Sequence, residues 1–363
     1  LNSGPPNTKV RKLNRLLLLL NCTMMALGGI GGPLIMRLYF LKGGKGVWTS
    51  SALETAGWPM VLITLVVSYV YRRDKEGPEA KMVLIMPRLL LPCAVLGVLT
   101  GLDDFLYAYG VDRLPTSTSA LIIATQLAFT AGFAFVLVRQ KFTPFSINAV
   151  FLLTVGAVVL GMHASTDRPN NESSKEYFKG FFTTLGASAL YGFVLPAFEL
   201  TCKKASQNVT YTLVMEMQMV MSFFATVFCG AGMLVHKEFA AIPIDASEFE
   251  LGEAKFYVVL VFNAILWQFF FMGAIGVTSC ASSLLSGIMI AVSLPVTEIL
   301  SVVFFHDKFK SEKAVSLVLS LWGLAYYFYG EARQEKKNKN KSKQQEGSAE
   351  EEEVLQLQGA NAA

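Results

Sequence analysis

The chain has 363 residues, of which 53% are hydrophobic and only 16% are charged. A soluble protein normally carries about a quarter charged residues, so this composition excludes an ordinary soluble fold. The net charge of +4 gives no indication of nucleic-acid binding, because a basic and an acidic stretch near the C-terminus nearly cancel. The five cysteines are scattered and lack metal-ligand spacing, which predicts free thiols and no metal site.

Long apolar runs joined by short polar segments follow one another along the chain. A run of about 20 apolar residues spans a bilayer as a helix, because the helix satisfies its own backbone hydrogen bonds. The sequence therefore predicts an all-α integral membrane protein with about ten transmembrane helices, at residues 16–37, 50–71, 87–110, 115–138, 143–163, 178–201, 209–235, 255–276, 279–305 and 313–330.

Two parts of this prediction have an alternative interpretation. The first run follows four basic residues, as the core of a signal peptide does. It is longer than such a core and similar spans follow it, which favours an uncleaved helix. Only Val277–Thr278 separates the eighth and ninth runs, and a re-entrant pair there would leave nine or eight spans.

An internal repeat divides the chain into two halves. Lys141-Phe142 recurs 167 residues later as Lys308-Phe309, and Pro33 recurs 163 residues later as Pro196. The prediction is two inverted five-helix repeats, because an odd number of helices per half turns the second half over in the membrane. This architecture is typical of alternating-access transporters with a substrate site near the midplane. The predicted segments are an N-tail over 1–15, the first repeat over 16–163, a linker over 164–177, the second repeat over 178–330 and a disordered C-tail over 331–363.

The Lys and Arg residues indicate the orientation. With both termini in the cytoplasm, the cytoplasmic segments hold 19 of the 31 Lys and Arg residues, in agreement with the positive-inside rule. The glycosylation sequon Asn171-Glu172-Ser173 then lies in the extracytoplasmic linker. The six Lys and Arg residues of the C-tail can lie against anionic membrane lipid. Nothing in the pattern indicates the oligomeric state.

The charged side chains inside the predicted spans are acidic. No Lys or Arg lies in the middle of a span, which argues against phosphorylated or carboxylated solutes, because these need a buried cation. Asp103, Asp104 and Glu298 lie in the outer halves of their spans, and Glu54 lies near the outer end of the second. Such carboxyl groups hold a proton or accept a hydrogen bond from a substrate N–H. The alternative is a structural pair with a backbone or hydroxyl donor.

Uncharged polar and aromatic side chains near mid-membrane are the other candidates for a substrate site. They are Thr100, Gln126, Tyr191, Asn263 and Ser293, and helical spacing adds Trp267 four residues after Asn263 and Tyr107 four residues after Asp103. An amide and an indole on one helix face suit a flat heteroaromatic ring, and Trp58 is predicted to supply a second stacking wall. Alternatively, each polar group bridges two helices.

Glycine and proline are concentrated in the first span. The stretch Gly28-Gly29-Ile-Gly31-Gly32-Pro33 predicts close helix packing and a local break in the helix. Close static packing alone is the alternative.

No catalytic constellation is recognisable. The three histidines lie at span ends or in loops, without zinc spacing or a nucleophile partner, and Lys42-Gly-Gly-Lys-Gly46 lacks the P-loop pattern. The sequence therefore predicts neither an enzyme nor a cofactor.

Several longer stretches carry a resemblance to a known family. They are Gly28-Gly-Ile-Gly-Gly-Pro-Leu, Tyr39-Phe-Leu-Lys-Gly-Gly, Gly101-Leu-Asp-Asp-Phe-Leu-Tyr-Ala-Tyr-Gly, Leu114-Pro-Thr-Ser-Thr-Ser, Gln126-Leu-Ala-Phe-Thr and Phe304-Phe-His-Asp-Lys-Phe. The five-plus-five plan resembles the drug/metabolite transporter superfamily. Within it the chain resembles a plant purine permease over nearly all of residues 14–330.

The resemblance implies a carrier of adenine and related bases, with cytokinins, the adenine-derived plant hormones, as further substrates. It also implies proton-coupled uptake, commonly at the plasma membrane, with the substrate in a central cavity. Other members are associated with alkaloids or vitamin B6, so another small uncharged or weakly basic solute is an alternative, as is a receptor that binds such a ligand without moving it.

The site hypothesis combines these residues. Asn263 and Gln126 are predicted to form hydrogen bonds with the edge of the purine, and Trp267 or Trp58 to stack on its ring. Asp103, Asp104 or Glu298 is predicted to hold the proton. Tyr107, Tyr191, Thr100 and Ser293 complete the predicted substrate site.

Overall fold

The computed structural model describes residues 8–77, 81–114, 119, 122, 123, 125–162, 174–305 and, with short gaps, 311–334. Residues 164–173 of the predicted linker, with its sequon, and nearly all of the predicted C-tail lie outside this part. In the described part the regular structure is helical. The helices are α1 (Thr8–Leu41), α2 (Val47–Thr55), α3 (Pro59–Glu76), α4 (Pro87–Arg113), α6 (Gln126–Val138), α7 (Pro144–Met162), α8 (Ser174–Lys203), α9 (Tyr211–Val235), α10 (Glu238–Glu248), α11 (Glu253–Cys280) and α12 (Ser283–Phe305). Residues 321–330 are also helical.

Within these residues, seven helices are long and apolar enough to cross a membrane, counting α2 and α3 as one interrupted helix. The two apolar helices α6 and α7 are shorter there. An all-α membrane protein is therefore confirmed, while the number of ten spans stays a prediction. α11 runs through Val277–Thr278 to Cys280, and α12 starts at Ser283. Both helices are long enough to cross, so the structure does not favour a re-entrant pair.

Helix starts follow local rules of the sequence. Pro59, Pro87 and Pro144 each occupy the first position of a helix, where the missing N–H of proline costs nothing. Thr210 caps α9 by accepting a hydrogen bond from the backbone N–H of Leu213, at 3.3 Å. Pro59 also explains why the second predicted span is divided into α2 and α3, since a proline interrupts the hydrogen-bond ladder of a continuous helix.

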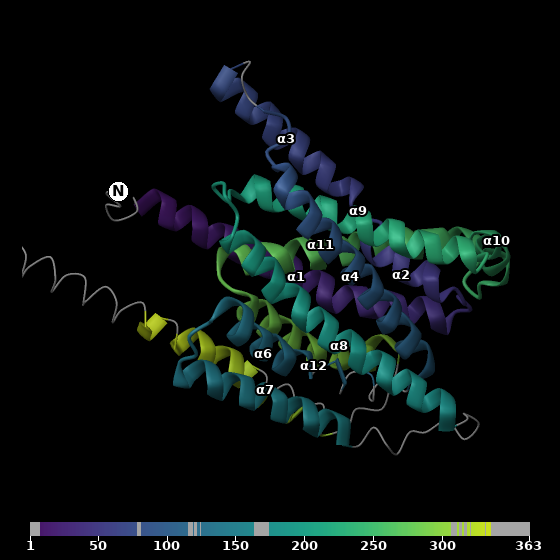
Figure 1. Cartoon of the computed structure of the whole chain (residues 1–363). Coiled ribbons are helices and arrows are strands. Elements are labelled where there is room, and N and C mark those ends of the chain that lie inside the picture. Colours follow the sequence, from purple (N-terminus) through teal and green to yellow (C-terminus); the bar gives the residue numbers. More distant parts are fainter. Residues whose placement is uncertain are drawn as a thin grey trace, which may run out of the picture.

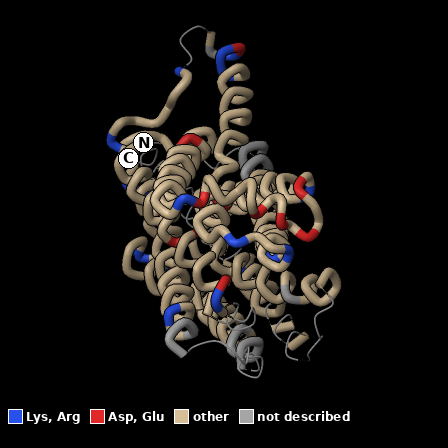
Figure 2. Tube along the Cα trace, turned by 90° about the vertical axis from the view of Figure 1, so that its right-hand side faces the viewer, with Lys and Arg blue, Asp and Glu red and all other residues tan. Residues whose placement is uncertain are grey.

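The long helices form one bundle (Figure 1), and α3 extends away from it, while α10 lies at the end where α9 finishes. Figure 2 views the bundle from one end and shows charged residues on loops and helix ends there. The helix sides expose large apolar side chains, among them Val67, Leu91, Val136 and Phe151. An apolar surface of this extent is expected for contact with lipid.

Glycines bring α1 and α11 into backbone contact. A Cβ atom on Gly28 would lie 2.7 Å from Cα of Phe270, and one on Gly273 would lie 2.7 Å from Cα of Met25. Small residues permit this approach in membrane helices. The predicted close packing is therefore confirmed. The predicted local break is not present, because α1 is one continuous helix with Pro33 inside it.

The helices pair in a symmetric pattern. α1 packs mainly on α11 and α12, whereas α8 packs mainly on α4 and α6. If the halves are related as the sequence predicts, α8, α4 and α6 are the counterparts of α1, α11 and α12. The pairing supports the inverted repeat, which itself stays a prediction.

Candidate functional site

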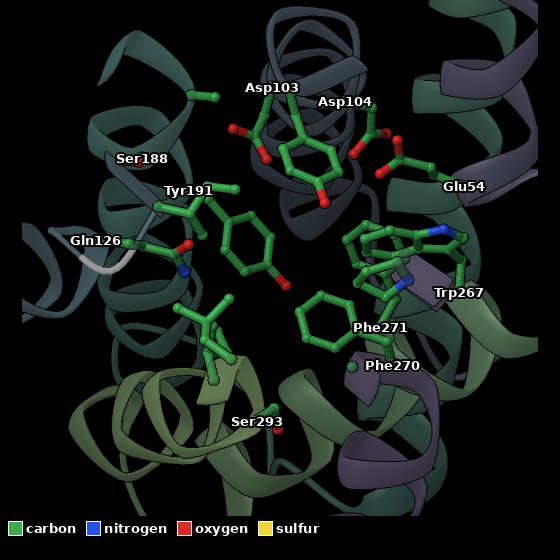
Figure 3. Close-up of a pocket in the computed structure, with 17 residues that line it drawn as sticks. Glu54, Asp103, Asp104, Gln126, Ser188, Tyr191, Trp267, Phe270, Phe271 and Ser293 are labelled. Atoms are coloured by element: carbon green, nitrogen blue, oxygen red, sulfur yellow. The ribbon is translucent and has the colours of Figure 1, made fainter. Parts of the chain in front are cut away.

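An internal cavity of about 80 Å³ lies in the middle of the bundle (Figure 3). We call it the central cavity. Helices from both predicted halves contribute to its wall. The lining residues are Gly29, Pro33, Glu54, Asp103, Asp104, Tyr107, Ile123, Gln126, Ala187, Ser188, Tyr191, Trp267, Phe270, Phe271, Ile290, Ser293 and Leu294.

Aromatic rings form a large part of this wall. The Tyr191 ring stacks on Phe270 with centroids 5.9 Å apart, and the Tyr107 ring meets Trp267 edge to face at 6.0 Å. The Trp267 ring is held close to α1 because Gly32 has no side chain there: a Cβ on Gly32 would lie 2.9 Å from the indole. Such flat apolar walls favour a planar ring as ligand.

Five buried polar atoms on the wall have no hydrogen-bond partner within the described residues. They are Glu54 Oε1, Asp104 Oδ2, Gln126 Nε2, Tyr191 Oη and Trp267 Nε1. Buried polar atoms are normally paired, and leaving one unpaired costs about 1–3 kcal/mol. In Figure 3 the carboxyl groups of Glu54 and Asp104 lie on one side of the cavity and the Gln126 amide on the opposite side. The wall thus offers hydrogen-bond donors and acceptors to one occupant.

The ionisable groups with a formal charge on the cavity wall are all carboxyl groups within the described residues. Glu54, Asp103 and Asp104 are all nearly or fully buried, and no Lys or Arg is among the lining residues that the structure describes. Three neighbouring carboxyl groups without a cation cannot all be ionised in a buried site. The wall therefore suits a neutral or weakly basic ligand and repels an anion.

A second space, which we call the vestibule, joins the central cavity on one side. It has a volume of about 350 Å³ and shares Pro33, Tyr107, Ile123 and Leu294 with the central cavity. Its remaining lining residues are Met36, Arg37, Phe40, Leu41, Val111, Asp112, Ser119, Thr297 and Ser301. They lie near the C-terminal ends of α1, α4 and α12, so the central cavity is approached from this end of the bundle.

Polar contacts hold the helices together at the opposite end. The Tyr211 hydroxyl of α9 donates to Asn21 Oδ1 of α1 at 3.0 Å. Glu199 of α8 accepts from the backbone N–H of Ser283, the first residue of α12, at 2.8 Å. Each contact connects α1 or α12 to α8 or α9. We call these two contacts the closed end.

Seven of the eleven predicted site residues line the central cavity. They are Asp103, Asp104, Tyr107, Gln126, Tyr191, Trp267 and Ser293. The Ser293 hydroxyl already donates to the carbonyl of Met289 in its own helix, at 2.9 Å. Contact of these seven residues with substrate stays a prediction.

The other four predicted residues are placed differently. Thr100 is buried and donates to the carbonyl of Leu96 at 2.9 Å, and Trp58 packs edge to face on Phe223 at 5.6 Å. Asn263 is buried one helical turn from Trp267 but does not line the cavity, and its Oδ1 has no partner within the described residues. The side chain of Glu298 lies outside the described residues.

Sequence reasoning gave little weight to three lining residues. Phe270 and Phe271 follow Trp267 at the spacing of one helix face, a signal that the sequence does carry. The sequence predicts Glu54 at the outer end of a span. The structure ends α2 one residue later, at Thr55, and so brings Glu54 to the central cavity.

The fold and the cavity define the class: a multi-pass helical membrane protein with an internal site shaped for a small flat molecule. A family model described as purine nucleobase transmembrane transport matches residues 16–337. Purine permease 3 of Arabidopsis thaliana is 54% identical over 319 residues, which are 87% of this chain and 91% of that protein. Purine permease 2 of the same plant is 48% identical over 339 residues, 90% and 95% of the two chains.

The chain therefore belongs to the purine permeases, a family of purine nucleobase transporters. It is a transport protein and not an enzyme, and the resemblance drawn from the sequence motifs is confirmed. A solved crystal structure of 15% sequence identity shares the fold, with a TM-score of 0.59 over 86% of this chain and 98% of the other.

Proposed function

We propose that the central cavity is the substrate site, that it binds adenine-type bases, and that the chain moves them by alternating access. The observation that carries the proposal is the set of five unpaired polar atoms on an aromatic wall. Adenine offers ring nitrogens as acceptors and N–H groups as donors. Gln126, Tyr191 and Trp267 supply donors to the ring nitrogens, while the carboxyl groups of Glu54 and Asp104 accept from N–H.

Cytokinins are proposed as further substrates. They are adenines that carry an apolar group on the exocyclic nitrogen, so they need space beside the base. The vestibule supplies this space, because it continues from the central cavity past Met36, Phe40 and Val111, which are apolar. An alkaloid or vitamin B6 uses the same flat walls but matches the donor and acceptor set less directly.

Proton coupling is proposed on the basis of the buried carboxyl groups. Asp103 and Asp104 line the cavity that holds the substrate in this proposal, and Glu298 was predicted as a third candidate from the sequence. A carboxyl group that takes up a proton with the substrate links the two binding events. If this is right, an uncoupler abolishes accumulation against a gradient. Accumulation that persists with the uncoupler would refute it.

The orientation and membrane are also part of the proposal. Both termini are placed in the cytoplasm by the distribution of Lys and Arg residues, and the vestibule end then faces outward. We propose the plasma membrane as the location, where an outward vestibule serves uptake. The basic C-tail is proposed to lie against anionic lipid.

The test is uptake of radiolabelled adenine into yeast that lacks its own purine carriers, using Trp267→Phe beside the wild type. The substitution keeps an aromatic ring but removes the indole N–H, and loss of one hydrogen bond to a buried partner is expected to raise KM about tenfold. Trp322→Phe is the matched control, because Trp322 is 64% exposed on the outer surface. Equal KM values for both variants would refute the assignment of Trp267.

A second measurement separates transport from mere binding. Counterflow of labelled adenine in proteoliposomes occurs only if the loaded protein changes its orientation, which a receptor does not do. Competition by a cytokinin would support the extended substrate range, and binding without counterflow would favour the receptor.

A further inference from the structure

Glu54 and Asp104 face one another on one side of the central cavity. Glu54 lies on α2 and Asp104 on α4, and Figure 3 shows their carboxyl groups pointing toward each other. Their side chains are 2% and 1% exposed, and each has an oxygen without a hydrogen-bond partner in the described structure. The pair is therefore enclosed by protein and open only to the cavity.

The position of Glu54 is fixed by the start of α2. The Glu238 carboxylate of α10 accepts from the backbone N–H of Trp48 at 3.2 Å and from that of Thr49 at 2.7 Å. The Trp48 ring also stacks on Phe105 of α4 at 3.9 Å. Because Phe105 directly follows Asp104 in the chain, α2 is anchored to the same turn of α4 that carries the other carboxyl group.

Among the described residues, the titratable groups that face the pair are acids, phenols and a thiol. Asp103 and Tyr107 face it from α4, Tyr191 from α8 and Cys229 from α9. The part of α11 near it contributes Trp267 and no titratable side chain. Two carboxyl groups in such an environment hold one proton between them, because two negative charges this close repel strongly where water is excluded.

An independent feature marks the place beside the pair as a ligand position. The indole N–H of Trp267 is buried, has no partner in the described residues and belongs to the same wall. A base seated there can donate an N–H to the ionised oxygen of the pair while it accepts from Trp267. The protonation state of the pair then determines whether the base finds an acceptor or a donor.

We infer that Glu54 and Asp104 together bind the coupling proton, with Glu54 as an essential member of the pair, so that one proton enters and leaves with each base. This inference rests on the proposed proton-coupled function. The balance is simple: in a state open to water the pair can be without a proton; it then takes one from the outer solution together with the base, holds that proton while water is excluded, and releases both inside. The pair, rather than a single aspartate, is then the coupling group.

The experiment compares wild type, Glu54→Gln and Glu253→Gln in proteoliposomes. Glu253 is an exposed glutamate at the start of α11, so its variant controls for the loss of a carboxylate. Two readouts are taken from each protein: exchange of adenine without a pH gradient, and accumulation driven by an inward proton gradient. Glu54→Gln removes one of the proposed acceptors for the base, so it is expected to slow exchange while leaving it measurable, to lose accumulation, and to show an exchange rate that varies little with pH.

A purely structural role for Glu54 would lower both readouts together and leave the pH profile unchanged. Because Glu54→Gln can also fail to fold, the double variant Glu54→Asp, Asp104→Glu is made as well. It keeps two facing carboxyl groups and is expected to restore accumulation and the wild-type pH dependence.

Three results would overturn the inference. In the first two, the wild type responds to the proton gradient. Glu54→Gln then either accumulates adenine as the wild type does, or keeps the wild-type pH dependence of exchange. The wild type could also exchange adenine without any response to a proton gradient, which would refute the proposed coupling itself along with the pair. The first two results leave the proposed function intact.

Discussion

The backbone contact between α1 and α11 leads to a sharp prediction for Gly28→Ala. At an open position in a helix, replacing glycine by alanine stabilises the helix by about 1 kcal/mol. At Gly28 the new methyl group would overlap the backbone of α11 at Leu266 and Phe270. Neither atom group belongs to a flexible side chain, so the two helices themselves must separate.

The expected magnitude follows from these two opposing effects. Overpacking of a tightly packed site costs about 1–3 kcal/mol, and backbone overlap places Gly28 at the upper end. After subtraction of the helix-propensity gain, the net loss is about 2 kcal/mol. Substrate binding suffers too, because α1 and α11 carry Gly29, Pro33 and Trp267 to the central cavity.

The assay is thermal melting of the detergent-solubilised protein, followed by the fraction that stays monodisperse. Gly132→Ala is the control, since a Cβ at Gly132 has no atom within 4 Å. Gly132→Ala should melt at or slightly above the wild-type temperature, and Gly28→Ala several degrees below it. If the two variants melt together, the close approach of α1 and α11 is refuted.

Two further predictions concern polar contacts outside the central cavity. Tyr211→Phe removes the hydrogen bond from α9 to Asn21 of α1 at the closed end. Labelling of Cys22, the next residue in α1, by a maleimide should then become faster. An unchanged labelling rate would argue against a role of this hydrogen bond in keeping the end closed. Glu248 of α10 bonds Lys45 at 2.8 Å, and this hydrogen bond, with the charge of Lys45, lowers the pKa of Glu248. The contact therefore stabilises the fold above the ordinary glutamate pKa and is lost as the pH falls through the lowered value. Lys45→Ala should slightly lower the melting temperature at about pH 7 and leave it unchanged below about pH 3, whereas an equal loss at both would refute the ion pair.

The sequence predicted the class of fold because apolar run length is a direct consequence of bilayer thickness. It did not predict the division of the second span, although Pro59 inside the apolar run carries the signal. It also missed α10, which is too short to span a membrane and contains Pro243. The position of α10 depends on packing at the end of the bundle, which periodicity does not report.

Seven of the predicted site residues line the central cavity for the same kind of reason. Depth in the membrane and the face shared with Trp267 selected the right helices, since these depend only on helical geometry. Asn263 satisfied both criteria but lies one turn to the wrong side of Trp267, whereas the cavity extends toward Phe270 and Phe271. Which neighbour fills the space beside a given turn depends on where the other helices cross, and the sequence does not contain that information locally.

The unpaired atoms of the central cavity connect stability with function. Each buried polar atom left without a partner costs stability that the rest of the bundle must supply. Gln126 Nε2 and Trp267 Nε1, on opposite walls, have no hydrogen-bond partner in the described residues. A ligand that pairs these atoms recovers part of that cost on binding. Because it binds only the folded bundle, bound substrate is expected to raise the free energy of unfolding.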